Sequence, residues 1–341
     1  MQPLVSILVP AYNAEGTIGV TLTSAVRQTW SRKEIIVVDD GSRDNTRAVA
    51  ETFAADGVRV ESQKNQGAAA ARNAAFALSR GDYIQWLDAD DLMSPNKIAA
   101  QLESVEEGDR RTVLSGSWGQ FFHRPARASF KPTGLWCDLS PVEWLTRKME
   151  QNVYMQTATW LVPREISEAA GQWDTRLLGD DDGEYFCRVL LNGERIRFVP
   201  EAKVFYRMSG AASLSYIGHS DKKMEAQLRS MRLHIDYVRS LDDSARVRRA
   251  CVTYLQNWLI NFYPERLDLV EQASALAKEL GGTLDRPRFS WKYAPIEATC
   301  GTSVAKRAQV LLPRAKWSMI ASWDRLMSRI HPDSTHRFGE Q

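Results

Sequence analysis

The first hundred residues alternate short apolar runs with segments that carry a helical apolar stripe. The β-branched apolar runs are typical of buried strands, and the stripes repeat with the spacing of one helix face. The predicted strands lie at 4–9, 34–38, 58–61 and 83–87, and the helical patterns at 17–28, 45–53 and 68–78. Strands that alternate with helices indicate right-handed βαβ units. The sequence therefore predicts an α/β fold with a mainly parallel sheet.

The rest of the chain divides into an irregular middle and a helical end. Strand patterns at 114–122, 157–162 and 196–200 and a helix pattern at 183–191 occupy the middle. Helical periodicity follows at 224–241, 244–262 and 267–280, then a loop at 281–295 and a last helix that we expect to break at Pro313 and end near Ile330. At about 150 residues per domain, the length allows two folding units. We expect an α/β domain at 1–215 and a helical C-terminal region at 216–341.

Charge and cysteine content narrow the class of protein. The net charge of +2 argues against a generally basic nucleic-acid binder, although residues 301–341 hold seven basic and three acidic residues. The four cysteines form no CxxC or Cys/His cluster, so we expect neither a zinc site nor a disulfide framework. No basic leader precedes the first apolar run, and no stretch of 18 apolar residues predicts a membrane span. We expect a cytoplasmic protein.

Acidic clusters occur at 39–40, 88–91 and 180–182, and the first two directly follow predicted strands. In parallel sheets ligands bind outside the carboxyl ends of the strands. Each cluster alone is ordinary turn or cap sequence. Several carboxylates at one edge, however, repel one another unless a cation or a hydrogen-bond donor separates them. Oxygen ligands of this kind suit Mg²⁺ or Mn²⁺ together with a substrate diphosphate.

The candidate phosphate-binding segment is a single glycine turn. The sequence has neither GxGxxG nor GxxxxGK[ST], so a dinucleotide fingerprint and a P-loop are excluded. Instead, Lys64-Asn65-Gln66-Gly67 leads into a helix that carries Arg72. A helix N-terminus with two cations nearby can approach an anion. The alternative is a solvated loop followed by an arginine on a helix face.

Four segments in this order resemble glycosyltransferase family 2, whose members have the GT-A fold. They are Val9-Pro10-Ala11-Tyr12-Asn13, Val37-Val38-Asp39-Asp40-Gly41-Ser42, Asn65-Gln66-Gly67 with Ala71-Arg72-Asn73, and Leu87-Asp88-Ala89-Asp90-Asp91. The likeness continues at 171–174, 181–182 and 199–207 and covers roughly residues 3–215. It implies a GT-A domain and transfer of a sugar from a nucleotide sugar with inversion. It does not extend to the helical C-terminal region predicted from the periodicity.

The resemblance implies a nucleotide-binding role for the matching residues. Pro10 and Ala11 would line the base, and Tyr12 would pack on its face. Asp40 would accept the N–H of uracil, which favours a UDP-sugar donor. The remaining positions would face the base, ribose or diphosphate: Lys64, Gly67, Arg72 and Asp88.

The same resemblance implies a metal pair and a catalytic base. Asp90 would be the direct ligand of Mn²⁺ or Mg²⁺, with Asp88 reaching the ion or the ribose. Asp182, or its neighbour Asp181, falls where the family places its base. The family often shows Glu-Asp followed by an aromatic residue, whereas a glycine follows here. The choice within 180–182 therefore stays open.

The predicted reaction is transfer of one sugar to a hydroxyl of a saccharide or lipid-linked acceptor, in cell-surface polysaccharide or glycoconjugate assembly. The Gln-x-x-Arg-Trp motif of processive polysaccharide synthases is missing. Two alternatives are a sugar-phosphate nucleotidyltransferase, which would normally carry a glycine-rich phosphate loop near its N-terminus, and a non-catalytic nucleotide-sugar-binding protein. We expect no nucleic-acid partner.

The last predicted helix is basic and amphipathic over residues 314–330. Its apolar residues fall mainly on one side and its arginines opposite: Trp317, Ile320, Trp323, Leu326, Met327 and Ile330 against Arg314, Arg325 and Arg329. Such a helix can lie on an anionic membrane surface, here the inner face of the cell membrane. The alternative is a helix that packs its apolar stripe on the body of the protein.

Overall fold

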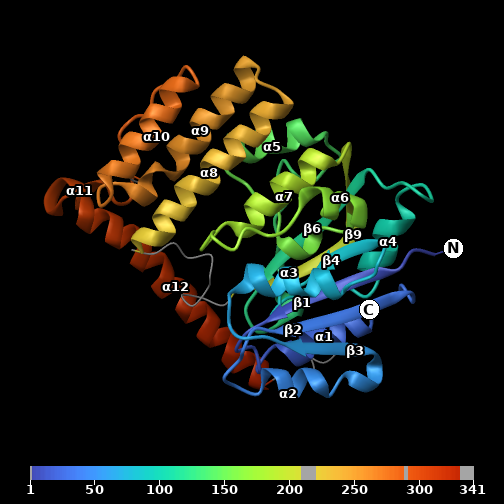
Figure 1. The fold of residues 1–341 in the computed structure, drawn as a ribbon. Helices are drawn as coiled ribbons and strands as arrows, with labels where there is room; N and C mark the ends of the chain where they lie inside the picture. The colour runs from blue at the N-terminus through green and yellow to red at the C-terminus, as the bar shows by residue number, and fades with distance from the viewer. Residues whose placement is uncertain (1, 209–219, 288–290, 331–341) are drawn as a thin grey trace.

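The computed structural model describes residues 2–208, 220–287 and 291–330. Two sheets form the centre of the molecule, and helices cover them (Figure 1). The predicted boundary at 215/216 and the end of the chain at 331–341 lie outside the described residues.

The first sheet has the strand order β3-β2-β1-β4-β8, and its first four strands are parallel. Its strands are β1 (Val5–Ala11), β2 (Lys33–Asp39), β3 (Val58–Ser62), β4 (Tyr83–Trp86) and the antiparallel β8 (Val162–Pro163). The connecting helices are α1 (Ile18–Val26), α2 (Thr46–Glu51) and α3 (Ala68–Leu78). All seven residues of β1 are buried, as expected for a central parallel strand covered on both faces. The predicted α/β fold is confirmed.

The second sheet has the order β5-β9-β6-β7. It consists of β5 (Leu92–Met93), β6 (Thr112–Phe121), β7 (Ser129–Phe130) and β9 (Arg195–Arg207). β9 runs parallel to β6 and extends well past the predicted strand at 196–200. Because β9 is long, its end at Arg207 reaches the carboxyl edge of the first sheet, where Arg207 donates to the carboxylate of Asp91.

The middle of the chain holds the main errors of the prediction. The predicted strand at 157–162 is wrong, since Thr157–Thr159 form a 3₁₀ turn and only β8 follows. Three helices were not expected: α4 (Lys97–Glu103), α5 (Pro141–Gln151) and α6 (Arg164–Ala170). The start of α5 is nonetheless well encoded, because the Ser140 hydroxyl caps the helix and Pro141 occupies its first position. The helix predicted at 183–191 is α7 (Asp181–Asn192).

In the described residues of the C-terminal region, the chain forms the helices α8 (Asp221–Leu241), α9 (Ala245–Phe262), α10 (Leu267–Glu279), α11 (Ala294–Cys300) and α12 (Thr302–Ile330). The expected break at Pro313 is wrong, because α12 continues through it. A proline removes one helical hydrogen bond, but side chains on both sides of it hold α12 to the body. Lys306 pairs with Glu265, and Asp324 pairs with Arg124. Within the described ranges, no helix has the length and apolar character needed to cross a bilayer.

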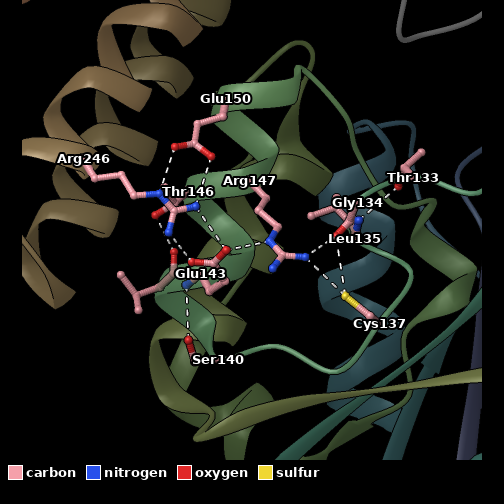
Figure 2. A network of polar contacts seen from close by, with 11 residues as sticks. Thr133, Gly134, Leu135, Cys137, Ser140, Glu143, Thr146, Arg147, Glu150 and Arg246 are labelled. Atoms are coloured by element: carbon pink, nitrogen blue, oxygen red, sulfur yellow. Dashed lines mark hydrogen bonds and ion pairs between the residues drawn. The ribbon is translucent and has the colours of Figure 1, made fainter.

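The helical region packs on the α/β part through α5 (Figure 2). Arg246 of α9 pairs with Glu143 at 2.7 Å and with Glu150 at 3.0 Å, which lie about two turns apart on the same face of α5. Arg147 pairs with Glu143 at 2.6 Å and donates to the carbonyl of Gly134 at 3.1 Å. Hydrogen bonds from the two arginines hold the pKa of Glu143 at about 2. Beneath this network, one hydrophobic cluster runs without interruption from β1 to α10.

Candidate functional site

The carboxyl edge of the first sheet gathers the residues that the sequence analysis selected. β1 ends in Pro10 and Ala11, which are buried, and Tyr12 follows with 44% of its surface exposed. Chain segments after β2 and β4 continue the same edge, because these two strands flank β1 in parallel. An exposed aromatic ring beside two buried strand ends provides a flat face onto which a base could stack.

Asp40, directly after β2, is almost completely buried and shapes the neighbouring loop. Its Oδ1 accepts from the backbone N–H of Gln66 at 2.9 Å and from the side chain of Gln63 at 2.7 Å, while its Oδ2 accepts from the N–H of Gly67 at 2.8 Å. Gly67, the residue directly before α3, has φ +93, a conformation that L side chains rarely adopt. Lys64 in this loop is exposed. In this structure, therefore, Asp40 fixes the loop before α3, and its role toward a base stays a prediction.

Arg72 of α3 joins two of the acidic clusters. Its Nη2 pairs with Asp88 and its Nη1 with Asp181, both at 2.9 Å, and its guanidinium lies 4.4 Å from the ring centre of Trp173. Burial alone would lower its pKa, but the carboxylates of Asp88 and Asp181 raise it, so Arg72 stays charged. The buried guanidinium of Arg72 thus holds the segment after β4 and the start of α7 together.

The segment after β4 contains the predicted metal pair. Burial, and next the neighbouring Asp88, raise the pKa of Asp90 to about 6, although Arg207 opposes the shift. Arg207 also donates to the Asp90 carbonyl at 2.9 Å. Asp91 differs from its neighbours, since it is fully buried and accepts from Gln156 and from the Arg207 N–H. It anchors β9 to the site, which leaves Asp90, together with the Asp88 carboxylate that Arg72 holds, as the carboxylates that could face a ligand.

The two remaining carboxylates fit a divalent cation of the predicted kind. Within the described part of the chain, no group of three or more His, Cys, Asp or Glu side chains could hold a metal by itself. Mn²⁺ and Mg²⁺ commonly bind through one or two carboxylates and take their other ligands from water and substrate phosphates. Burial, and next Asp88, disfavour the ionised form of Asp90, and a divalent cation bound at the pair would favour it.

The three aspartates at 180–182, at the start of α7, have different partners. Burial is the largest cause that raises the pKa of Asp181, to about 6, and also that of Asp182. The Asp182 carboxylate accepts from the hydroxyl of Thr157 at 3.3 Å. Asp180 is instead turned toward α8, where it accepts from Ser230 at 2.7 Å and from Gln227 at 3.3 Å.

Gly183 provides the space that this arrangement of Asp180 needs. A Cβ at position 183 would lie 2.1 Å from Oδ1 of Asp180 and 3.3 Å from Cε1 of His234. Asp180 itself has φ +57, which aspartate tolerates better than most residues. The glycine that departs from the usual family pattern therefore permits a contact between the start of α7 and the helical region.

Two residues of the site were not selected from the sequence. Arg207 entered only as part of a resembling segment, yet it contacts both Asp90 and Asp91. Tyr154 is half exposed, its ring centre lies 5.2 Å from that of Trp118, and burial followed by the Asp182 carboxylate raises its pKa. No sequence signal distinguished Tyr154 from the other aromatic residues of the middle region, because the contact depends on how distant segments pack.

The fold and the site define an α/β protein with carboxylates gathered at the carboxyl edge of its parallel strands, and the comparisons identify its family. The profile of "Glycosyl transferase family 2" matches residues 6–139. Glycosyltransferase GlyG of Streptococcus pneumoniae is 34% identical over 218 residues, which cover 61% of this chain and 71% of GlyG. The chain belongs to glycosyltransferase family 2.

Other matches to curated relatives are shorter. A UDP-Glc:α-D-GlcNAc-diphosphoundecaprenol β-1,3-glucosyltransferase of Escherichia coli, WfgD, is 40% identical over 103 residues, 30% of this chain and 41% of WfgD. The chain spans 35 to 62% of the length of several further relatives, which is less than two thirds.

Two solved structures share the GT-A-like fold. Residues 1–349 of TarS from S. aureus, in complex with UDP-GlcNAc, superpose with a TM-score of 0.66 at 18% identity, covering 81% of each chain. A mannosyltransferase of Pyrobaculum calidifontis, in complex with GDP-Man and Mn²⁺, gives a TM-score of 0.54 at 18% identity, covering 95% of this chain and 85% of its own. At these identities the likeness concerns the fold, which confirms the predicted architecture with its C-terminal helical region.

Proposed function

We propose that this glycosyltransferase moves one sugar from a UDP-sugar to a hydroxyl of a saccharide or lipid-linked acceptor, with inversion at the anomeric carbon. The observation that carries the proposal is the position of Arg72 between Asp88 and Asp181. It brings the carboxylates that suit a metal and a diphosphate next to those that suit a general base. A UDP-linked donor is supported by the structure of TarS in complex with UDP-GlcNAc and by the name of WfgD, which specifies UDP-Glc.

Family membership favours sugar transfer over the two alternatives, a nucleotidyltransferase and a non-catalytic binding protein. WfgD, by its name, acts on a diphosphoundecaprenol-linked sugar. A lipid-linked acceptor, in cell-surface polysaccharide or glycoconjugate assembly, is accordingly the acceptor class that we propose. The reaction would take place in the cytoplasm, with peripheral contact to the inner face of the cell membrane through residues 314–330.

Asp90 and Asp88 would hold the divalent cation, Mn²⁺ or Mg²⁺. When bound, such a cation neutralises the charge that develops on the departing nucleoside diphosphate. The mannosyltransferase solved with Mn²⁺ supports this choice. Tyr12 would stack on the base, and the N–H groups at the start of α3, near exposed Lys64, would face the phosphates.

Asp182 is the proposed base. Asp180 is bound by Ser230 and Gln227, and Asp181 is bound by Arg72, so Asp182 has the carboxylate least committed to other side chains. Its proton affinity is raised mainly by burial and next by Asp180. It would accept the proton of the acceptor hydroxyl while that oxygen attacks the anomeric carbon from the face opposite the leaving diphosphate. Displacement in one step inverts the configuration.

A panel of nucleotide sugars tests the proposal, with thermal shift and release of nucleoside diphosphate measured with and without Mn²⁺. We expect a UDP-sugar to stabilise the protein by about 2.7 kcal/mol at a hundredfold excess over Kd, and Asp90→Asn to reduce the Mn²⁺-dependent part. Asp182→Asn should still bind the donor but lose roughly 10²–10⁴-fold in transfer, the usual contribution of a general base. Asp180→Asn is the matched control, and its loss should be smaller.

The proposal fails if no nucleotide sugar raises the melting temperature in the presence of Mn²⁺. Wild-type transfer by Asp182→Asn would leave the fold and family intact but exclude Asp182 as the base. Equal losses in the 180 and 182 variants would mean that the cluster acts as a unit.

A further inference from the structure

Helix α12 presents two different faces along its length. One face is held to the body: Asp324 is 8% exposed and accepts from the backbone N–H groups of His123 and Arg124 at 2.8 and 3.1 Å. The Arg124 guanidinium donates to the same carboxylate at 2.6 Å. Near the other end of the helix, Lys306 donates to the carbonyl of Tyr263 at 2.8 Å. Figure 1 shows α12 along one side of the molecule, running from α11 toward the N-terminal sheet.

The opposite face carries an exposed apolar row. The row consists of Leu312, Met319, Trp323, Leu326 and Ile330, which are 57, 74, 63, 50 and 57% exposed. At 100° per residue these five positions fall within an arc of about 60°, roughly 130° from Asp324, and span about 27 Å of helix. The alternative considered from the sequence, in which the apolar stripe packs on the body, therefore does not hold for these exposed residues. Trp317, by contrast, turns toward the body and lies 5.7 Å from the ring of Phe122.

Positive charge borders the apolar row. α12 contains six basic residues and a single acidic one, Asp324, which is already paired with Arg124. Lys316, Arg325 and Arg329 are exposed, and within the described residues no acidic side chain pairs with them. This excess of charge opposes contact with a second copy of the same helix. It is complementary to a surface that offers both an apolar layer and negative charge.

We infer that the row Leu312–Met319–Trp323–Leu326–Ile330 inserts into the interfacial layer of an anionic lipid bilayer, with Lys316, Arg325 and Arg329 facing the phosphate headgroups. A helix with an apolar row, an interfacial tryptophan and flanking basic residues lies in the plane of such a surface. This inference deepens the peripheral location proposed for the chain and rests on that part of the proposal. It does not depend on the donor or on the base.

The contacts of α12 also relate the lipid surface to the site. Asp324 binds the backbone at His123 and Arg124, and the carbonyl of the preceding residue, Phe122, accepts from Arg207 at 3.1 Å. Arg207 in turn donates to the carbonyl of Asp90. A helix lying on a bilayer would therefore be connected to the carboxylates proposed for the metal, first through the 122–124 segment and then through Arg207. This arrangement suits an acceptor whose hydroxyl is presented close to the headgroups.

The test is co-sedimentation of the full chain with vesicles of phosphatidylcholine alone and of equal parts phosphatidylcholine and phosphatidylglycerol. We expect binding to the mixed vesicles and little to the neutral ones. The double variant Met319→Glu/Trp323→Glu should lose at least about tenfold in partitioning, since two exposed apolar side chains no longer leave water. Lys316→Gln and Arg329→Gln should each lose about fivefold. Leu267→Glu on α10, a residue that is 54% exposed, is the matched control and should bind like the wild type.

Three results would overturn the inference: no sedimentation of the wild type with mixed vesicles, equal partitioning of the double variant, or a wild-type oligomer that the double variant dissociates in light scattering. The last result would assign the row to a second copy of the chain. Release of nucleoside diphosphate from a soluble donor is measured on the same samples. Loss of vesicle binding with unchanged release separates this inference from the proposed transfer.

Discussion

Replacement of Gly183 by alanine reverses the usual effect of this substitution in a helix. Gly→Ala within a helix ordinarily stabilises a protein by up to about 1 kcal/mol. Here the added Cβ would lie 2.1 Å from Oδ1 and 2.9 Å from Cγ of Asp180. The carboxylate of Asp180 must move, and its hydrogen bonds with Ser230 and Gln227 of α8 are then lost.

The magnitude follows from those two bonds. A hydrogen bond to a charged group contributes about 1.5–3 kcal/mol, and the 2.7 Å bond from Ser230 belongs to this class, whereas the 3.3 Å bond from Gln227 is weaker. Alanine gains at most about 1 kcal/mol from its higher helix propensity. Because the lost hydrogen bonds of Asp180 outweigh this gain, we expect the free energy of unfolding to fall by roughly 1–3 kcal/mol. Because Asp182 follows the displaced turn, transfer activity should fall as well.

Urea unfolding measures this effect in two comparisons: Gly183→Ala against Gly19→Ala, and Gly183→Ala with and without the side chain of Asp180. Gly19→Ala in α1 is the control, since its Cβ would meet Val49 at 3.5 Å, an ordinary contact, and it should be neutral or stabilising. Asp180→Gly removes the obstructing carboxylate and suits the positive φ. In that background, Gly183→Ala should no longer destabilise. An equal loss with and without the Asp180 side chain would refute the reasoning.

Two further predictions concern protonation. Because burial raises the pKa of Asp182, the proposed base, the transfer rate should increase with pH above the usual range of a carboxylate and then level off; a transfer rate that stays the same from pH 5 to pH 8 would contradict this. The pKa of Glu143 is lowered to about 2 by Arg246 and Arg147, so its contribution to stability is complete above about 4.5 and is lost as pH falls through 2. After allowance for the half-exposed Arg246, Glu143→Gln should lower the free energy of unfolding by about 1–2 kcal/mol at pH 7 and by much less at pH 3; equal losses in urea unfolding at both pH values would count against the network of Figure 2.

The first hundred residues were predictable because the central strands carry runs of buried apolar residues, as all seven positions of β1 do, and polar clusters follow the strand ends. The structure of the middle region was not predictable in the same way, because local side-chain hydrogen bonds there override the pattern of apolar and polar residues. The β-branched residues of Thr157–Thr159 suggested a strand, but the Gln156 side chain accepts from the N–H of Ala158 and closes a turn instead. The helix α5 was missed although Ser140 and Pro141 mark its start, since its apolar positions are interspersed with charged ones.

For the site, the sequence could predict which residues reach the sheet edge, but not what each one contacts there. Asp88, Asp90 and Asp181 follow from strand ends and from the family resemblance. The loop-holding bonds of Asp40, and the turn of Asp180 toward α8, depend on segments that lie far away in the sequence. Such contacts are decided by packing between elements, and no periodicity along the chain records them.

The contact made possible by Gly183 has a consequence for how this protein can be recombined with its relatives. The helical region is not an independent module, because Ser230 and Gln227 donate hydrogen bonds to Asp180, and because α5 and α9 belong to one hydrophobic core. A chimera that joins another family member's helices to residues 2–208 would leave Asp180 without its partners beside an unfilled glycine. Working exchanges should therefore carry positions 180, 183, 227 and 230 as a set, because their side chains depend on one another across the apparent domain boundary.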